Sequence, residues 1–561
     1  MFEKKRLFPL MALLANPVLI VGCGGDDEPT PVAPPPPEPP ASPGAPATPA
    51  NPQATLDAGA GTVSVTWDAS ANANTYAVLR SVGDGDAETL ASGIAGTSYV
   101  DEAAAWGMAQ YTVTASGTGG TSSASAAVEV GYGEEALFLQ EAWANRVDVA
   151  PMLGNPFDRK NPDFRPQAGS PALEGAATFA DLTPLVLALP PEVAAGFVAA
   201  ASAFFDATAN YVGAVGPDHD WTQEAWTTFG EADMGGVMAS ASAVLSGDIS
   251  DVRVLSADTT YTINGIVTVE EGGELHIPAG THLHGSTEIQ PSALIVRVGG
   301  KLFSEGSEDA PVVFTSANPP EERQKGDWGG VVLNGASLCN FPAGECVGEG
   351  SSGEYGGDNR ADDSGVITYT RIEYAGYEIS FGNELNALTM NGVGSGTTIH
   401  HVQTHAGSDD GFEWFGGTVN TKHLLATDIS DDSFDYSTGF QGMGQFWLAQ
   451  QDPNDGDNGF EVDGNEDDYN ATPYTLPLLA NITLIGKGVD GAGGTEGESV
   501  DGLRLRRGTG GIITNALIIG FGDDGLDIDN AETLERAKAG VFAVTFSIID
   551  MNAAAFESPG S

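Results

Sequence analysis

A seven-residue motif recurs in the second half of the chain and restricts the folds that this sequence can adopt. Residues 408–414, Ser-Asp-Asp-Gly-Phe-Glu-Trp, are followed 22 residues later by 430–436, Ser-Asp-Asp-Ser-Phe-Asp-Tyr, and every position matches in kind. Weaker echoes begin at Asn458, Asp501 and Gly522. One structural unit per twenty-odd residues, with short apolar segments between Gly, Asn and Asp, is typical of a parallel β-helix. A β-propeller needs a repeat of about 40 to 50 residues.

The repeat places carboxylates at equivalent positions of neighbouring coils. Adjacent strands lie about 4.8 Å apart, so stacked like charges repel each other unless a cation lies between them. A set of oxygen ligands suits Ca²⁺. The alternative is that these acids are turn residues at strand ends, a role that Asp often fills. The candidate calcium ligands are Asp409, Asp410, Glu413, Asp431, Asp432, Asp435, Asp523, Asp524 and Asp527.

A second group of residues suggests contact with a polysaccharide. β-Helices can carry lyases, which need a base such as Arg beside a calcium-bound uronate, or hydrolases, which need paired carboxylates. Arg504 and Arg506, close to Asp501, are candidates for a base or for binding a uronate. Trp414 and Tyr436 are further candidate ligand contacts. The alternative for the arginines is an exposed strand whose charges pair with nearby acids. The sequence assigns no catalytic residue.

Several motifs occur in the order found in a known family. They include Gly280-Thr-x-Leu-x-Gly, Pro311-Val-Val-Phe-Thr-Ser, Trp328-Gly-Gly, Arg371-Ile-Glu-Tyr-Ala-Gly and the Asp-Asp-Gly-Phe-Glu block. From about 255 to 530 the chain therefore resembles a largely uncharacterised family of secreted or lipid-anchored bacterial surface proteins. That resemblance implies a right-handed parallel β-helix, and it implies no particular activity.

The order of the motifs departs from that family at one place. The Phe-Arg-Pro, Tyr-x-Gly-Ala and Trp-Thr motifs usually follow the last coil, whereas here they lie at 161–229, before the first coil. An open end of a β-helix exposes backbone groups and apolar core, so it must be covered. We therefore expect residues 155–230 to pack on the β-helix as a cap, of the same chain or of a neighbour through self-association at the β-helix ends.

Residues 54–132 have the alternation of a small β-sandwich. Val63-Ser-Val-Thr-Trp67, Tyr76-Ala-Val and Tyr111-Thr-Val-Thr-Ala are placed as in a fibronectin type III domain, which this segment resembles throughout. The resemblance implies a spacer or interaction module. The aromatic residues are expected in its core.

The start of the chain predicts export and a lipid anchor. Lys4, Lys5 and Arg6 precede an apolar run that ends at Ile20-Val-Gly-Cys23, which resembles a bacterial lipobox. We expect residues 1–22 to be a signal peptide, Cys23 to carry lipid, and the Pro-rich residues 23–53 to form a tether. Gly24 favours sorting to the outer membrane, by analogy with enterobacterial lipoproteins. The remaining cysteines, Cys339 and Cys346, flank a Pro-Ala-Gly turn and are expected to form a local disulfide.

Charge excludes some partners. The 561 residues contain 22 Lys and Arg against 77 Asp and Glu, a formal net charge of −55. No basic surface is available to bind nucleic acid or to adhere broadly to anionic lipid. A secreted protein in salty water or in water rich in divalent cations fits this balance.

The sequence therefore predicts a mainly β protein with a fibronectin-like sandwich at 54–132, an irregular, partly helical segment at 133–250 and a β-helix at 251–561. The predicted function is that of an outer-membrane-anchored surface lipoprotein. It would bind extracellular glycan or matrix, with calcium for stability and without catalysis. The alternatives are a polysaccharide lyase or glycoside hydrolase on the same scaffold, and a structural or adhesion component.

Overall fold

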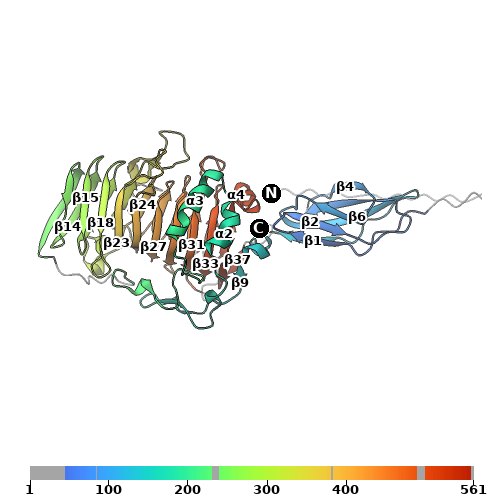
Figure 1. Ribbon diagram of the computed structural model, residues 1–561, viewed down its shortest axis with the longest axis horizontal. Helices are drawn as coiled ribbons and strands as arrows, with labels where there is room; N and C mark the ends of the chain where they lie inside the picture. The colour runs from blue at the N-terminus through green and yellow to red at the C-terminus, as the bar shows by residue number, and fades with distance from the viewer. Residues whose placement is uncertain (1–43, 84, 230–238, 381–382, 489–499, 557–561) are drawn as a thin grey trace, which may run out of the picture.

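The computed structural model describes residues 44–83, 85–229, 239–380, 383–488 and 500–556. The signal peptide, Cys23 and most of the tether lie outside these residues. The chain forms a small sandwich followed by a long stack of strands, with two helices lying across the side of the stack (Figure 1). No helix among the described residues is long and apolar enough to cross a membrane.

The N-terminal sandwich consists of two antiparallel sheets, β1-β2-β5 and β4-β3-β6-β7, with β8 beside β6. Alternate residues of β2, β3 and β6 point into a common core that contains Trp67, Tyr76 and Tyr111. The rings of Trp67 and Tyr76 lie 5.3 Å apart, so these aromatics are core residues as the sequence predicts. The strands are β1 (Gln53–Asp57), β2 (Thr62–Thr66), β3 (Thr75–Val82), β4 (Glu88–Ile94), β5 (Ser98–Asp101), β6 (Gly107–Gly117), β7 (Gly120–Thr121) and β8 (Val128–Tyr132).

The second part is a parallel β-helix. Its strands belong to one sheet in which nearly every strand pairs in parallel with a strand of the next coil, two to three further along the chain. The early coils contain β12 (Ala241–Ile249), β13 (Val252–Val254), β14 (Thr259–Val269), β15 (Glu274–Pro278), β16 (His282–Gly285), β17 (Ala293–Val296), β18 (Lys301–Glu305), β19 (Val312–Ser316), β20 (Gly330–Asn334) and β23 (Gly365–Glu373). The later coils contain β24 (Leu388–Asn391), β25 (Thr398–His405), β26 (Phe412–Phe415), β27 (Asn420–Thr427), β28 (Phe434–Ser437), β29 (Met443–Gln450), β30 (Phe460–Val462), β31 (Leu478–Ile485), β32 (Leu503–Leu505), β33 (Gly511–Ile519), β34 (Asp524–Ile528), β35 (Phe542–Thr545), β36 (Ile548–Asp550) and β37 (Ala554–Phe556).

Apolar side chains that stack from coil to coil form the β-helix core. Phe412 of β26 lies 5.5 Å from Phe434 of β28, and Trp414 lies 4.7 Å from Trp447 of β29, measured between ring centres. All four residues are fully buried. The 22-residue repeat therefore sets the register of this core, because Phe412 pairs with Phe434 across the two strands.

The first coil begins earlier than the sequence predicts. β12 pairs in parallel with β14, so the β-helix starts at Ala241 and the predicted boundary at 251 is wrong. The reason is that β12 is the terminal strand and faces solvent over most of its length, with Leu245 and Ile249 as its buried residues. Its sequence therefore lacks the apolar run of an inner strand.

The last coil is covered by residues that follow the sandwich directly. β9 (Arg146–Val147) adds a parallel strand beside β36, and the carboxylate of Glu134 accepts a 2.8 Å hydrogen bond from the backbone N–H of Ile528. The ring of Phe138, in α1 (Glu134–Phe138), stacks on that of Phe556 at 6.0 Å. Residues 134–147 are thus the cap of this end, and the expectation that 155–230 cap it is corrected.

Residues 150–229 pack along the side of the late coils instead. Asn515 of β33 exchanges hydrogen bonds of 2.7 and 3.0 Å with the backbone of Ala177, and Thr483 accepts one of 2.8 Å from Ala214 N–H. Figure 1 shows α2 and α3 lying across these strands. α3 begins at prolines, which suit a first turn, and continues with strong helix formers. The elements of this segment are β10 (Leu153–Asn155), β11 (Asp163–Pro166), η2 (Pro171–Leu173), α2 (Phe179–Val186), α3 (Pro191–Phe204) and η3 (Trp221–Gln223), while η1 (Glu141–Trp143) belongs to the cap.

A long connection between β20 and β23 folds back over the β-helix. Cys339 and Cys346 form a disulfide within it, which closes a short loop. Its elements are β21 (Val347–Gly348), η5 (Glu349–Ser351) and β22 (Gly353–Glu354). Two further helical elements, η4 (Pro320–Glu322) and α4 (Ala531–Lys538), lie in other connections.

Candidate functional site

The second acid of each repeat has a structural role at the turn that enters a strand. Asp410 accepts a hydrogen bond of 3.1 Å from the N–H of Asp432, and Asp432 accepts one of 2.7 Å from the N–H of Asn458. Asn458 in turn accepts from Asp501 at 3.2 Å, and Asp501 from Asp524 at 3.0 Å. These five residues form a ladder in which each of the first four side chains satisfies a backbone N–H of the next coil. The presence of Asn458 in the ladder means that the position requires an acceptor and not a charge.

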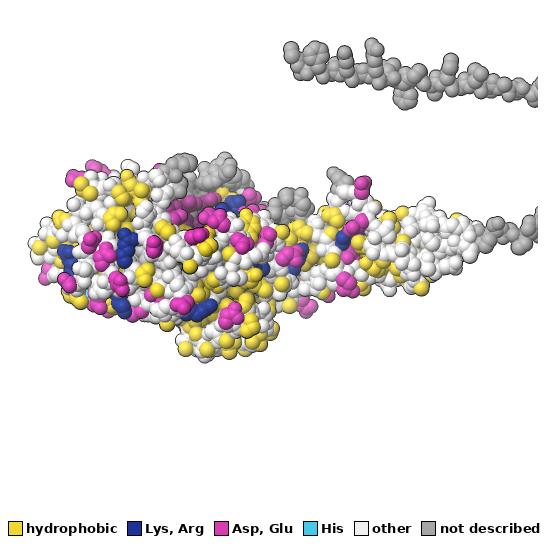
Figure 2. All heavy atoms as spheres, turned by 90° about the horizontal axis from the view of Figure 1, so that it is seen from above, with side chains coloured by type: hydrophobic (Ala, Val, Ile, Leu, Met, Phe, Trp, Pro, Cys, Tyr) yellow, Lys and Arg dark blue, Asp and Glu magenta, His cyan; other side chains and the backbone are white. Residues whose placement is uncertain are grey.

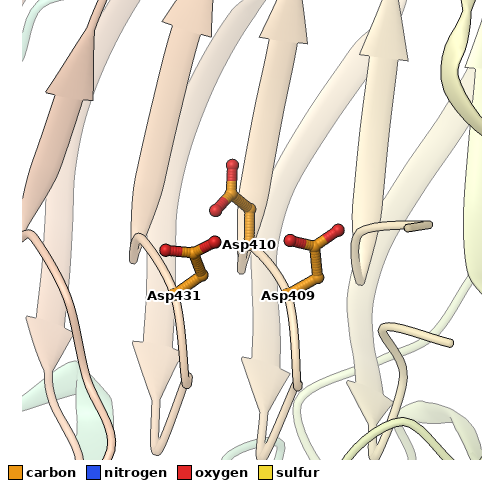
Figure 3. A group of neighbouring side chains, drawn as sticks. All are labelled: Asp409, Asp410 and Asp431. Carbon is orange, nitrogen blue, oxygen red and sulfur yellow. The ribbon is translucent and has the colours of Figure 1, made fainter. Parts of the chain in front are cut away.

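The first acid of each repeat lies beside this ladder. Figure 3 shows Asp409 and Asp431 on equivalent turns of adjacent coils, with Asp410 between them. Loss of water and the charge of Asp431 raise the pKa of Asp409 to about 8. Loss of water and the charge of Asp457, one coil further on, raise the pKa of Asp431 to about 6. The carboxyl groups of this row therefore cannot all be ionised at neutral pH unless a cation lies beside them.

A third row of acids lies on the strands themselves. Glu413 of β26, Asp435 of β28 and Glu461 of β30 occupy the same register position on three adjacent parallel strands. The row continues with Arg504 of β32 and Asp527 of β34. Because side chains alternate along a strand, these residues face away from the aromatic core.

Trp414 and Tyr436 point into the β-helix, because successive side chains of a strand face opposite sides. Each side chain is fully buried in the β-helix core, so the prediction that these two residues contact a ligand is wrong. The physical reason is that each follows an outward-facing acid by one position and therefore points inward.

The first three members of this row, Glu413, Asp435 and Glu461, line a polar cleft with a volume of about 590 Å³. Figure 2 shows a hollow lined by Asp and Glu side chains on the β-helix part. The connection that carries the disulfide forms one wall and supplies Glu349 and Tyr355, while the segment after β30 supplies Asp463 and Glu466. The side-chain N–H of Asn386 donates to Glu413 and, at 3.5 Å, to Glu349, so it joins the wall to the strand row.

The carboxyl groups of the cleft are electrostatically strained. Loss of water raises the pKa of Glu349 to about 7 and that of Glu461 to about 7, the latter in spite of the nearby Arg506. The pKa values of Glu413 and Asp435 are raised well above their ordinary range, first by burial and then by neighbouring carboxylates. One oxygen of Asp435, Oδ1, is buried and has no hydrogen-bond partner in the described part of the chain.

Arginines stand at one end of the cleft, and they are paired. Arg506 donates two hydrogen bonds to Asp463, of 2.9 and 3.0 Å, and another to Glu461. Burial lowers the pKa of Arg506, but these acids outweigh that effect and raise it above its ordinary value. Arg507 donates to Asp463 at 2.6 Å, and Arg504 to Asp529 at 3.2 Å. This arrangement matches the alternative given for the arginines in the sequence analysis, in which their charges pair with nearby acids.

Several groups of acids have the spacing of a cation site. In each group of three, one oxygen per residue lies within 4.8 Å of the others. All donors are carboxylate oxygens, which suit a hard cation such as Ca²⁺, and the unpartnered Asp435 Oδ1 supplies a free ligand atom. The groups are Asp409–Asp410–Asp431, Asp410–Glu413–Asp435, Asp431–Asp432–Asp457, Asp432–Asp435–Glu461 and Asp501–Asp523–Asp524.

The sequence prediction and these groups overlap without being identical. Asp501, predicted as a ligand contact, joins Asp523 and Asp524, whereas Asp527 belongs to no such group among the described residues. The sequence prediction does not include Asp457 and Glu461, which belong to these groups, although the weaker repeat that begins at Asn458 is a signal for them. Glu349 was missed because it comes from a connection outside the repeat.

The comparisons with known proteins identify the second part of the chain. Residues 247–557, more than half of the chain, match the pectate-lyase-like β-helix domain family. The chain belongs to this family. No curated protein matches the chain. Among solved structures, a Fn3-like protein from Clostridium thermocellum is 33% identical over 16% of this chain and 92% of its own, with a TM-score of 0.14. A structure described as a myokine is 18% identical over 16% of this chain and all of its own, with a TM-score of 0.15. This pectate-lyase-like β-helix protein carries its acidic cleft on the outer side of strands β26, β28 and β30.

Proposed function

We propose that this pectate-lyase-like β-helix protein is a lipid-anchored surface protein that binds an acidic extracellular polysaccharide through calcium held in its cleft. The observation that carries the proposal is the row Glu413–Asp435–Glu461, in which the buried Oδ1 of Asp435 has no partner among the described residues. Calcium would be held by these carboxylates and by those of the row on the neighbouring turns, Asp409, Asp431 and Asp457. Bound there, it would neutralise the cleft and leave coordination positions for the ligand's carboxylates.

The charge of the cleft supports a role for the cation in binding. Without one, the acids of the cleft would repel a polysaccharide that carries carboxylates. With calcium bound, the same surface attracts it, and Arg506 and Arg507 add hydrogen-bond donors at one end. Binding is therefore expected to require calcium.

The state of Arg506 favours binding over cleavage. A lyase that works by proton abstraction needs a base whose pKa lies near the working pH. The pKa of Arg506 is raised, and its guanidinium is held by Asp463 and Glu461. The second candidate, a polysaccharide lyase or glycoside hydrolase, is favoured by the family description and by the paired carboxylates of the cleft.

A binding and cleavage assay separates the two candidates. The purified mature protein is incubated with acidic and neutral polysaccharides, in calcium or in chelator, and both retention and new unsaturated or reducing ends are measured. The expected result is calcium-dependent retention of acidic polysaccharides without new ends. Asp435→Asn should weaken retention, whereas Glu308→Gln, at an exposed acid outside the cleft lining, serves as the matched control. Retention in chelator would contradict the binding proposal, and new ends would favour the enzyme.

The anchor rests on the lipobox-like sequence that ends at Cys23. Cys23 carries the lipid, and the Pro-rich tether holds the sandwich and the β-helix away from the outer membrane. Cys23→Ser should release the protein from the membrane fraction. Continued membrane retention of this variant in high salt and carbonate would contradict the anchor.

A further inference from the structure

A second cavity lies between the side of the β-helix and helices α2 and α3, which together are called the helical hairpin. Its volume is about 320 Å³, and α2, α3 and the residues after α3 cover it where they cross β29, β31 and β33 (Figure 1). Pockets for small molecules start at about this volume. It contains none of the residues that line the acidic cleft.

The helical side of the cavity is apolar. Phe179 and Leu182 of α2, Ala201 of α3 and Phe205 after it contribute to the lining. Exposed residues, Ser202 among them, also line it, so the cavity reaches the protein surface. A small molecule could therefore enter without unfolding the hairpin.

The β-helix side of the cavity is a row of amides. Gln445 donates a 3.0 Å hydrogen bond to Asn481, Asn481 donates one of 2.7 Å to Tyr211 O, and Asn515 donates one of 3.0 Å to Ala177 O. Each amide nitrogen carries two N–H groups. In the described part of the chain each of these nitrogens makes one such bond, so each keeps a second donor. The polar side of the cavity thus offers donors to a ligand.

The charge at the cavity selects against anions. Asp206 lines it, and hydrogen bonds from Thr208 lower the pKa of this carboxyl, so it stays ionised at neutral pH. The net charge of −55 repels anions further. Apolar walls with a few polar groups are the usual composition of a small-molecule site.

We infer that this cavity binds a neutral, mostly apolar small molecule that carries a hydrogen-bond acceptor such as a carbonyl group. The apolar part contacts the α2–α3 side, and the acceptor takes a hydrogen bond from the amide row. This site is independent of calcium and of the proposed glycan binding.

A fluorescent dye tests the inference on the full mature protein in chelator. The probe is the neutral dye propionyl-dimethylaminonaphthalene, whose emission shifts to the blue in apolar surroundings, and dimethylaminonaphthalene is the comparison dye without the carbonyl. Ser202→Phe should fill the cavity and weaken binding by roughly tenfold or more, which corresponds to about 1.4 kcal/mol. Ala203→Phe, the neighbouring exposed position outside the lining, is the matched control and should bind as the wild type does.

The outcomes are distinct. Saturable binding that Ser202→Phe weakens and Ala203→Phe preserves supports the site, provided that circular dichroism shows both variants folded. No binding, or equal binding to all three proteins, would overturn it and leave a packing gap between hairpin and β-helix. Equal affinity for the two dyes would overturn the role of the amide row.

Discussion

Replacing Asp435 by Asn tests the electrostatic argument for calcium, because Asp435 lies between Glu413 and Glu461 on adjacent strands. Neighbouring strands lie about 4.8 Å apart, and two ionised carboxylates at that distance repel by roughly 3.5 kcal/mol at an effective dielectric of 20. The raised pKa values of Glu413 and Asp435 mean that protons already remove part of this repulsion. We therefore expect Asp435→Asn to stabilise the calcium-free protein by about 1 to 3 kcal/mol.

Calcium should narrow or reverse the difference in stability between the two proteins. A cation at a hundred times its dissociation constant stabilises the wild type by about 2.7 kcal/mol, and Asp435→Asn should lose most of that gain. Thermal unfolding is followed by near-UV circular dichroism of the buried aromatic residues, which include Trp414 and Trp447 of the β-helix core. The measurement is made at fixed ionic strength with chelator or calcium. For a domain of this size 1 kcal/mol moves Tm by about 2 °C or less.

The same thermal-unfolding assay includes a control variant and can refute the electrostatic argument. Glu308→Gln removes one exposed acid outside the cleft and should change neither midpoint. The reasoning is refuted if Asp435→Asn is less stable than the wild type in chelator, or if calcium shifts both proteins equally.

Three further predictions follow from the same residues. In chelator, the free energy of unfolding should fall as the pH rises from about 5 to 8. The reason is that Asp431 and Glu461 have folded pKa values of about 6 and 7, above their unfolded values of about 4. A thermal-unfolding midpoint that does not change over this pH range would contradict the prediction. Asp432→Ala should destabilise the protein by about 1 to 3 kcal/mol because the N–H of Asn458 loses its acceptor, whereas Asp432→Asn should not. Chemical denaturation measures the free energy of unfolding of both variants, and an equal decrease in the two would count against the ladder. The truncated chain 241–561 should self-associate or melt earlier, since it lacks the cap at 134–147; a monomer with an unchanged midpoint by sedimentation and calorimetry would show that no cap is needed.

The sequence predicts the β-helix well because its core depends on a local pattern. The match of residues 408–414 to 430–436 sets the pairing of Phe412 with Phe434 and of Glu413 with Asp435. The same pattern contained the signal that Trp414 points inward, since it alternates with the outward Glu413. Terminal strand β12 was missed because exposure removes the need for an apolar run.

The rest of the site depends on contacts that no short pattern encodes. Inserted loops change the spacing of the row from 22 residues between Glu413 and Asp435 to 26 between Asp435 and Glu461. Glu349 reaches the cleft from a connection outside the repeat. The pairing of Arg506 with Asp463 joins residues 43 positions apart. Tertiary structure alone brings these groups together.

The most direct test of the calcium site is anomalous diffraction from crystals of the mature protein grown with Ca²⁺. The account predicts an anomalous peak in the cleft, about 2.3 to 2.6 Å from Asp435 Oδ1 and from a carboxylate oxygen of Glu413 or Glu461. The peak should be missing in Asp435→Asn. A cleft without a peak, in crystals that carry ordered calcium elsewhere, would contradict the account.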